Sequence, residues 1–276
     1  LQAGDESIGS TNNNLDGALI TGNRFTWKGT DMKSITHGLF TGHSIDVNIK
    51  YNYLDHVPLG IIRKSSCNMV NNSGGVAYNI VKSGAVAVNV KGISNVSIYN
   101  NTLYTDRTTT ETWRGLIRVY TNTDITPHSV AHGTKIFNNI FYTKNQTISI
   151  QISDEECLKD FESDYNVFYC ENGSPIFDYC GSIKTFEQWQ ALGYDTHSIV
   201  INPDFKDFVN FVPTKRLDYG TNLGTNWIEG LATNAKWGTT SPETALQNGH
   251  WQVGAIIYKE VATTAPVPVY SGSVIN

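Results

Sequence analysis

The sequence predicts an all-β fold in which short strands stack, coil upon coil, as a solenoid. Three observations predict it: an asparagine recurs at fairly regular intervals, a second short strand follows most of these asparagines, and helical signal is almost absent. A unit of roughly 20 to 50 residues that repeats along a chain is the signature of such a stack. One unit cannot bury its apolar face alone, so neighbouring units together form the core.

The recurring asparagine stands inside a short β-like run, just before a hydrophobic residue. Successive clear matches are 29, 27, 22, 38 and 27 residues apart, and a looser match occurs at 69–72. Asparagines at equivalent corners of a stack can form a ladder, because each side-chain amide both donates and accepts hydrogen bonds. We therefore expect the clear matches to mark the corners of successive coils. They are Asn23, Asn52, Asn79, Asn101, Asn139 and Asn166.

A second short strand follows most of these asparagines, with glycine or asparagine at the bends. Two short strands per coil are typical of a parallel β-helix, and the repeat indicates about seven coils. In the run 86–91 the alternation predicts that the valines face the core, while Ala87, Asn89 and Lys91 face solvent. The second strands are expected at 38–42, 60–64, 86–91, 115–120 and 148–152.

Helical signal is confined to one short segment, 182–192. Thr185 or Ser182 can cap the N-terminus of a helix there. The helix is expected to carry three large hydrophobic residues, Phe186, Trp189 and Leu192.

The repeat divides the chain into three parts. Residues 1–195 are expected to form the β-helix coils. From about Thr196 the period is lost, and 196–260 is expected to be a C-terminal cap that packs on the helix and shields its last coil. Residues 261–276 read as an extended, proline-containing linker. The chain starts at Leu1 and ends in this tail, which suggests part of a larger multidomain chain, although a processed or trimmed chain explains the ends equally well.

Composition narrows the class of protein. Hydrophobic residues make up 39% and charged residues only 16% of the 276 residues, so uncharged polar residues must form much of the surface. The net charge of -5 argues against a nucleic-acid partner, and no apolar run reaches the ~18 residues of a membrane span. The four cysteines lack CxxC spacing, so a zinc site is not expected. Cys170 and Cys180 either form a disulfide or remain buried thiols.

Two groups of motifs resemble a known family. One is the pair of rungs Tyr-Asn-Asn-Thr-Leu-Tyr at 99–104 and Phe-Asn-Asn-Ile-Phe-Tyr at 137–142. The other is the ending, which includes Gly-Tyr-Asp-Thr-His-Ser at 193–198, Asn-Pro-Asp-Phe at 202–205 and Trp-Gln-Val-Gly-Ala at 251–255. Over about residues 15 to 260, the chain is similar to secreted right-handed parallel β-helix proteins of the pectate-lyase-like superfamily.

The resemblance implies a right-handed, single-stranded parallel β-helix that is secreted or lies at a cell or virion surface. Members include polysaccharide lyases, glycoside hydrolases, epimerases, phage tailspikes and non-catalytic surface proteins, so the function has to be argued from the site. We expect an extracellular carbohydrate-active domain and, if it is an enzyme, a polysaccharide lyase acting on acidic uronate glycans. The alternative is a non-catalytic glycan-binding or structural module of a larger surface or phage-fibre protein.

Alignment of the second strands brings three cations to one outward position. The alignment makes Arg63, Lys91 and Arg118 equivalent, one coil apart. Strands in such a stack lie ~4.8 Å apart, so the cations would form a column that suits the carboxylates of a uronate chain. Ordinary exposed cations on strand faces are the alternative. The hydrophobic residues taken as equivalent inward positions are Ile62, Val90 and Ile117.

The resemblance also implies roles for these cations. In lyases of the superfamily a lysine or arginine removes the proton α to the sugar carboxylate, and a second cation, sometimes with Ca²⁺, stabilises the enolate-like transition state. By that analogy Lys64 or Lys91 is the base, and Arg63 and Arg118 hold the carboxylate. Ca²⁺ is the one cofactor that the resemblance allows.

Histidine and aspartate residues form a second candidate group. His37 and His43 flank one second strand, while Asp55 and His56 lie in the corner that leads to the next. A carboxylate beside a histidine can act as an acid/base pair, so His56 joins the catalytic candidates, and Asp55 and His43 are candidates for substrate binding. The alternative is a corner aspartate that caps backbone amides beside a solvated histidine. The chain contains no HxH or HExxH spacing, which would indicate a transition-metal site.

Aromatic residues and carboxylates complete the candidates. Trp113 and Arg114 sit in a long insertion between coils, where loops usually build a binding face and flat rings can stack on sugars. A glycoside hydrolase needs two carboxylates at roughly 5 to 9.5 Å and is the weaker expectation, because no Asp-Asp doublet occurs. Other aromatic candidates, each of which can equally pack in the core, are Trp27, Tyr120, Tyr142 and Tyr169. The carboxylates in the coils are Asp46, Asp55, Asp106, Glu111 and Asp124.

Overall fold

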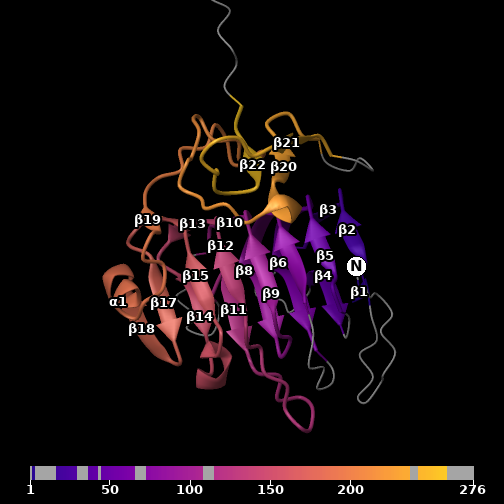
Figure 1. The fold of residues 1–276 in the computed structure, drawn as a ribbon, viewed down its shortest axis with the longest axis vertical. Helices are drawn as coiled ribbons and strands as arrows, with labels where there is room; N and C mark the ends of the chain where they lie inside the picture. Colours follow the sequence, from indigo (N-terminus) through magenta and orange to yellow (C-terminus); the bar gives the residue numbers. More distant parts are fainter. Residues whose placement is uncertain are drawn as a thin grey trace, which may run out of the picture.

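The computed structural model describes residues 2–3, 17–29, 37–42, 45–65, 73–107, 115–236 and 242–259. Within these ranges the chain is nearly all-β, as the sequence predicts, and most strands pair in parallel. The strands form two large sheets and one small sheet, and a short α-helix lies at one end of the assembly (Figure 1).

The six-stranded sheet takes one strand from each unit of the repeat. Its strands follow one another in chain order, and each is parallel to the next. They are β2 (Leu19–Thr21), β5 (Asn48–Lys50), β7 (Gly74–Ala77), β9 (Val96–Tyr99), β12 (Lys135–Phe137) and β15 (Glu162–Asp164).

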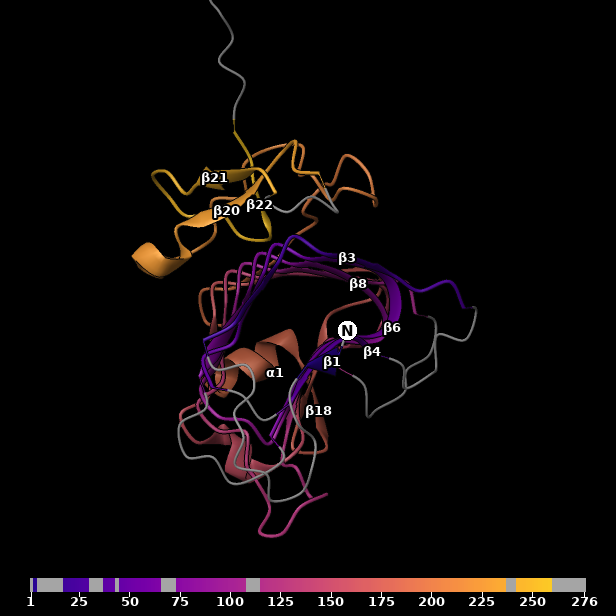
Figure 2. The ribbon, with the colours of Figure 1, turned by 90° about the vertical axis from the view of Figure 1, so that its right-hand side faces the viewer.

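The larger sheet consists of two stacks of strands that meet at a bend. β6 (Tyr53–Lys64) and β8 (Ile80–Lys91) run through the bend, so their first residues pair in stack one and their last residues in stack two. The sheet therefore curls into an arch (Figure 2). Stack one also contains β3 (Arg24–Thr26), β10 (Thr102–Thr105), β13 (Ile140–Asn145), β16 (Val167–Asn172) and β19 (Ile199–Val200). Stack two also contains β1 (Gln2–Ala3), β4 (His37–Gly42), β11 (Ile117–Tyr120), β14 (Ile148–Ile152), β17 (Ile176–Tyr179) and the antiparallel β18 (Ser182–Thr185).

The predicted asparagine ladder is confirmed at the corner between the six-stranded sheet and stack one. Each ladder asparagine from Asn23 to Asn139 donates from Nδ2 to Oδ1 of the next, at 3.0 to 3.1 Å. The same Oδ1 accepts the backbone N–H of the preceding asparagine at 2.8 to 3.1 Å. One row of side chains thus satisfies the buried corner of successive units, because each amide serves two neighbours.

A residue with positive φ precedes every ladder asparagine. Gly22 has a φ of 70°, and the other five positions have values between 52° and 59°. This left-handed conformation turns the chain at the corner; glycine adopts it freely and asparagine more readily than most residues. Two of the tyrosines are held there by their hydroxyl groups, which donate to backbone carbonyls of the C-terminal segment. The five positions are Tyr51, Tyr78, Asn100, Asn138 and Tyr165.

The apolar core lies inside the curl, between the six-stranded sheet and the two stacks. Aligned positions on neighbouring strands of stack two place large aliphatic side chains one above another. One such row, fully buried, is Leu39, Ile61, Val88, Ile117 and Ile150.

A bulge interrupts the predicted alternation in β8. The N–H groups of Ala87 and Val88 both donate to the carbonyl of Leu116, so both side chains lie in the core. The expectations that Val86 faces the core and Ala87 faces solvent are therefore wrong. Val86 instead belongs to a separate cluster on the outer face of stack two, with Phe40, Leu59, Ile62 and Ala85.

The predicted short helix is α1 (Phe186–Ala191), and Thr185 is its N-cap. Thr185 Oγ1 accepts from the backbone N–H of Gln188, whose side chain accepts from the backbone of Thr185. Trp189 is fully buried, with its ring stacked 5.0 Å from that of Phe177, whereas Leu192 is 42% exposed. The helix covers the end of the core at the last unit.

The described parts of the C-terminal segment, 203–236 and 242–259, lie along the outside of stack one (Figure 2). Its elements are η2 (Thr225–Trp227), β20 (Glu229–Ala232), β21 (Thr244–Leu246) and β22 (Ile256–Ile257). Within the predicted cap, 196–260, β19 pairs with β16 of the last unit, and the later part of the segment covers outward side chains of several successive units. These side chains are Tyr53, Ile80, Tyr104 and Tyr142.

Two further expectations concern the cysteines and the membrane. Cys170 and Cys180 are free thiols, so the disulfide alternative is not realised in the structure. In the described part of the chain no helix has the length and apolar character needed to cross a membrane.

Candidate functional site

The outer face of stack two carries two rows of polar side chains, which we call the polar strip. One row consists of Lys64, Lys91 and Tyr120, aligned across β6, β8 and β11. The other consists of Asn89, Arg118, Gln151 and Asp178, aligned from β8 to β17. Neighbouring positions in a row lie ~4.8 Å apart along the stack. The strip also includes Asp124, from the loop after β11, which contacts the first row.

The predicted column of three cations is not present. Arg63 aligns with Val90, and Arg118 aligns with Asn89, so neither shares the position of Lys91. The alignment took Ile62 as an inward residue, but Ile62 lies in the outer apolar cluster and Arg63 faces the interior. A shift of one residue in a strand exchanges its two faces, which is why the error moved Arg63 from the inside to the outside.

Arg63 is a buried structural residue, only 1% exposed. Its guanidinium donates to the carbonyl oxygens of Val47 at 3.1 Å and Ser73 at 3.2 Å. Burial lowers the pKa of Arg63 to about 10, so the group stays charged at neutral pH. From the interior it cannot hold a ligand on the outer face.

Lys64 and Lys91 lie side by side and share one carboxylate. Lys91 Nζ is 2.5 Å and Lys64 Nζ is 3.6 Å from Asp124 Oδ2. The hydrogen bond from Lys91 lowers the pKa of the Asp124 carboxyl. The two ammonium groups are therefore partly neutralised by the chain itself.

Tyr120, in the first row, contacts both rows. Its ring is 4.0 Å from Arg118 Cζ and 5.5 Å from Lys91 Nζ, as cation–π contacts require. Its hydroxyl accepts from Asn89 Nδ2 at 3.4 Å. Burial raises the pKa of Tyr120, so the phenol stays protonated at neutral pH.

Hydrogen-bonding capacity is unused at the centre of the strip. Asn89 Oδ1 and Arg118 Nε are buried, and neither has a hydrogen-bond partner among the described residues. Rotating the Asn89 amide by 180° would only exchange which of its two polar atoms is unpaired. A buried polar group left unpaired costs about 1–3 kcal/mol, so this pair marks a place where a ligand gains more than it would on an ordinary surface.

Gln151 and Asp178 fix the far end of the second row. Gln151 Nε2 donates to Asp178 Oδ2 at 2.8 Å, and the backbone N–H of Gly181 donates to Asp178 Oδ1 at 2.7 Å. Both side chains are 4% exposed. This buried carboxylate is already paired, so it serves to position Gln151 beside Arg118.

The histidine and aspartate group lies away from the polar strip, across the bend of the sheet. Asp55 aligns with Thr26 in stack one, and its carboxylate pairs with Arg24 at 3.0 Å. His56 has a φ of 58° at the bend of β6. His37 and Arg24 line a cavity of about 290 Å³ at the edge of the stack. Three other predicted site residues, His43, Trp113 and Arg114, lie outside the described residues.

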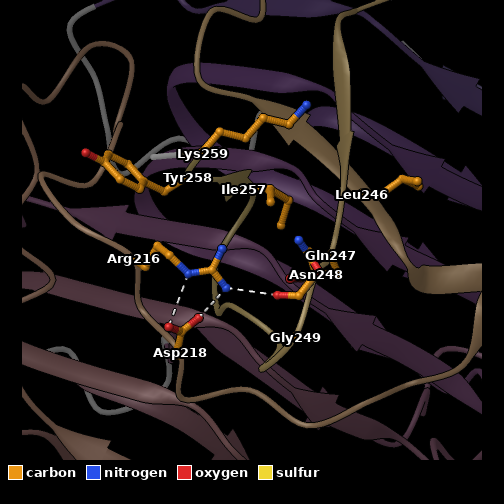
Figure 3. Close-up of a pocket in the computed structure, with 9 residues that line it drawn as sticks. All are labelled: Arg216, Asp218, Leu246, Gln247, Asn248, Gly249, Ile257, Tyr258 and Lys259. Carbon is orange, nitrogen blue, oxygen red and sulfur yellow. Dashed lines mark hydrogen bonds and ion pairs between the residues drawn. The ribbon is translucent and has the colours of Figure 1, made fainter. Parts of the chain in front are cut away.

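A larger cavity, of about 890 Å³, lies within the C-terminal segment (Figure 3). Arg216 lines it and donates to Asp218 Oδ1 at 2.7 Å and to the carbonyl oxygens of Asn248 and His250. Because its arginine is committed to the protein, this cavity offers a ligand less than the polar strip does.

A calcium site finds no support in the described residues. No group of three or more His, Cys, Asp or Glu side chains there could hold a metal ion. The carboxylates of the strip, Asp124 and Asp178, are each engaged by donors of the protein. The residues present do not fit the Ca²⁺ that the resemblance allows.

Sequence reasoning missed three members of the strip and found the others. Asn89 was expected to face solvent but had no assigned role, and Gln151 and Asp178 were not considered. Their signal was a polar residue at the outward position of β8, β14 and β17, in register with Arg118 on β11. Tyr120 and Asp124 were candidates only as an aromatic residue and a coil carboxylate.

The chain was also compared with protein-family models, with curated proteins and with solved structures. None of the three comparisons gave a match.

Proposed function

We propose that this chain is a right-handed parallel β-helix, secreted or carried at a cell or virion surface, which binds an acidic polysaccharide along the polar strip. Its three stacked strands per unit, the asparagine ladder and the resemblance of its rungs to the pectate-lyase-like superfamily support the fold. A parallel stack of strands with polar side chains at regular spacing supports the binding of an extended chain.

The observation that carries the proposal is that two buried polar atoms, Asn89 Oδ1 and Arg118 Nε, have no hydrogen-bond partner among the described residues. A uronate residue brings both complementary groups. Its carboxylate accepts hydrogen bonds from the Arg118 guanidinium, and a neighbouring hydroxyl donates to Asn89 Oδ1. Tyr120 supplies a flat ring beside them, which suits the apolar face of a sugar.

Cleavage by β-elimination is the second candidate, favoured by the closeness of Lys91, Tyr120 and Arg118. The lysine amine would remove the proton at the carbon next to the carboxylate, while Arg118 stabilises the resulting negative charge. The electron pair then forms the ring double bond, the bond to the leaving oxygen breaks, and Tyr120 donates the proton that this oxygen takes up. The lysine must first lose its proton, which its contact with Asp124 opposes.

The test is Arg118→Met, with binding to a uronate homopolymer measured by calorimetry. We expect the affinity to fall about 10- to 100-fold, since hydrogen bonds to charged groups are worth about 1.5–3 kcal/mol. Lys135→Met is the matched control, because Lys135 is a paired, exposed cation on the six-stranded sheet. Arg118→Lys keeps the positive charge but loses the planar guanidinium with its parallel donors. Its affinity should lie between those of wild type and Arg118→Met.

The same proteins, incubated with a panel of uronate polysaccharides, report on cleavage through the ultraviolet absorbance of the unsaturated product. A rise that depends on Arg118 and Lys91 supports the lyase. Binding without a rise leaves the non-catalytic glycan-binding module. Equal affinities of wild type and the well-folded Arg118→Met variant would overturn the proposal.

A further inference from the structure

Lys64 and Lys91 form a compact site for an anion. They are aligned on neighbouring strands, and both ammonium groups contact the same oxygen, Asp124 Oδ2. Their side chains are only 21% and 17% exposed, so the stems are fixed against the sheet while the charged ends meet at one point. Two lysine ends that converge on one oxygen are arranged as they would be around a ligand oxyanion.

The carboxylate in this site belongs to a loop, not to the sheet. Asp124 follows β11 in a loop closed by the bridge between Asn122 and Ser129, and its backbone N–H is held by Asn122 Oδ1 at 3.1 Å. Its side chain is 53% exposed, far more than either lysine. A carboxylate so exposed is readily rehydrated, so Asp124 can leave the lysines for water at small cost.

We propose that Lys64 and Lys91 are an anion subsite which Asp124 occupies in the free protein, and that an oxyanion of an acidic glycan binds there by displacing Asp124. The inference rests on the proposed function of the polar strip and adds a second anchoring point to it. Arg118, on β11, binds one acidic group. The lysine pair, on β6 and β8, binds a second acidic group. The oxyanion is a carboxylate or a sulfate ester, since both accept hydrogen bonds from ammonium groups.

Removal of the competing charge tests this. In Asp124→Asn the lysines are free, so affinity for the uronate homopolymer should rise about tenfold at low salt, with a steeper fall as salt increases. The matched control is Glu162→Gln, which frees Lys135 from an ion pair with a carboxylate of similar exposure on the six-stranded sheet. The control removes the same charge from the protein and should leave the affinity within about twofold. A sulfated neutral polysaccharide, compared with the uronate polymer, identifies which oxyanion the lysines prefer.

A second readout follows the lysines directly. Amine-labelling of Lys64 and Lys91, quantified by mass spectrometry, should be slow in wild type, fast in Asp124→Asn and slow again once glycan is added to that variant. An affinity of Asp124→Asn equal to that of Glu162→Gln, or labelling that glycan does not slow, overturns the anion subsite alone. If no variant binds any acidic glycan, the proposed function fails, and the subsite fails with it.

Discussion

At the scale of single residues, Asp195 shows how the ladder ends. Every ladder asparagine donates toward the next unit, so the last one, Asn166, needs a partner that accepts. Asp195 is that partner: its carboxylate accepts from Asn166 Nδ2 at 2.8 Å, Ser198 Oγ at 2.6 Å, Ser163 Oγ at 2.7 Å and Trp189 Nε1 at 2.7 Å. Burial raises the pKa of Asp195, and these four hydrogen bonds act in the opposite direction. A carboxylate, which only accepts when ionised, is the side chain best suited to this position.

Asp124 gives a prediction about pH. Its folded-state pKa lies below the ordinary value, because Lys91 holds the ionised form. A lowered folded-state pKa contributes stability above the unfolded value, about 4, and that stability is lost as pH falls through the folded pKa. We expect Asp124→Asn to be slightly less stable than wild type at pH 7, and this difference should shrink as the pH falls below about 4.

Urea denaturation of both proteins at a series of pH values measures this difference. Glu162→Gln is again the control for a lost surface pair. A gap between wild type and Asp124→Asn that widens as the pH falls would contradict the assignment.

At the scale of elements, the ladder and the second strands differ in how far the sequence predicts them. The ladder was predictable because the short asparagine amide both donates and accepts along the stack, so the spacing of the asparagines marks the corners. The register of stack two could not be predicted from the sequence in the same way. A bulge at Ala87 and Val88 puts both residues in the core, and Ile62 is outward yet buried. Hydrophobicity alone therefore assigned Ile62 and Arg63 to the wrong faces.

The ladder should be most sensitive in its interior. In Asn101→Ala, the backbone N–H of Asn79 loses its acceptor and Asn139 Oδ1 loses one of its donors. Two buried groups with lost partners should reduce the free energy of unfolding by about 3 kcal/mol or more. Asn23→Ala, at the first rung, removes a partly buried residue whose amide donates, among the described residues, to Asn52 and Thr21. This change should cost about 1 kcal/mol.

Chemical denaturation of the two variants under the same conditions gives the comparison. The order matters more than the absolute values, because both substitutions remove the same side chain from equivalent corners. An equal loss at Asn23 and Asn101 would mean that the rungs do not act as a connected chain.

At the scale of the whole molecule, the sequence predicts a boundary near residue 195, between coils and cap. The cluster that joins the C-terminal segment to stack one contains Phe211 and Leu231 from the segment, and Tyr104 and Tyr142 from the stack. A shared core of this kind couples the two parts, because neither buries these side chains alone. The segment and the stack should therefore unfold together.

Phe211→Ala tests this coupling. Phe211 is fully buried, with its ring 5.4 Å from that of Tyr104, and its truncation should cost about 3–5 kcal/mol. If the two parts form one cooperative unit, the loss lowers the urea midpoint of the whole protein, and far-ultraviolet circular dichroism and tryptophan fluorescence follow one transition. Phe208→Ala is the matched control, since Phe208 touches the same tyrosine but is 39% exposed and should cost much less. Two separate transitions, with only the weaker one shifted by Phe211→Ala, would show instead that the segment is a domain of its own and that the sequence boundary is also a folding boundary.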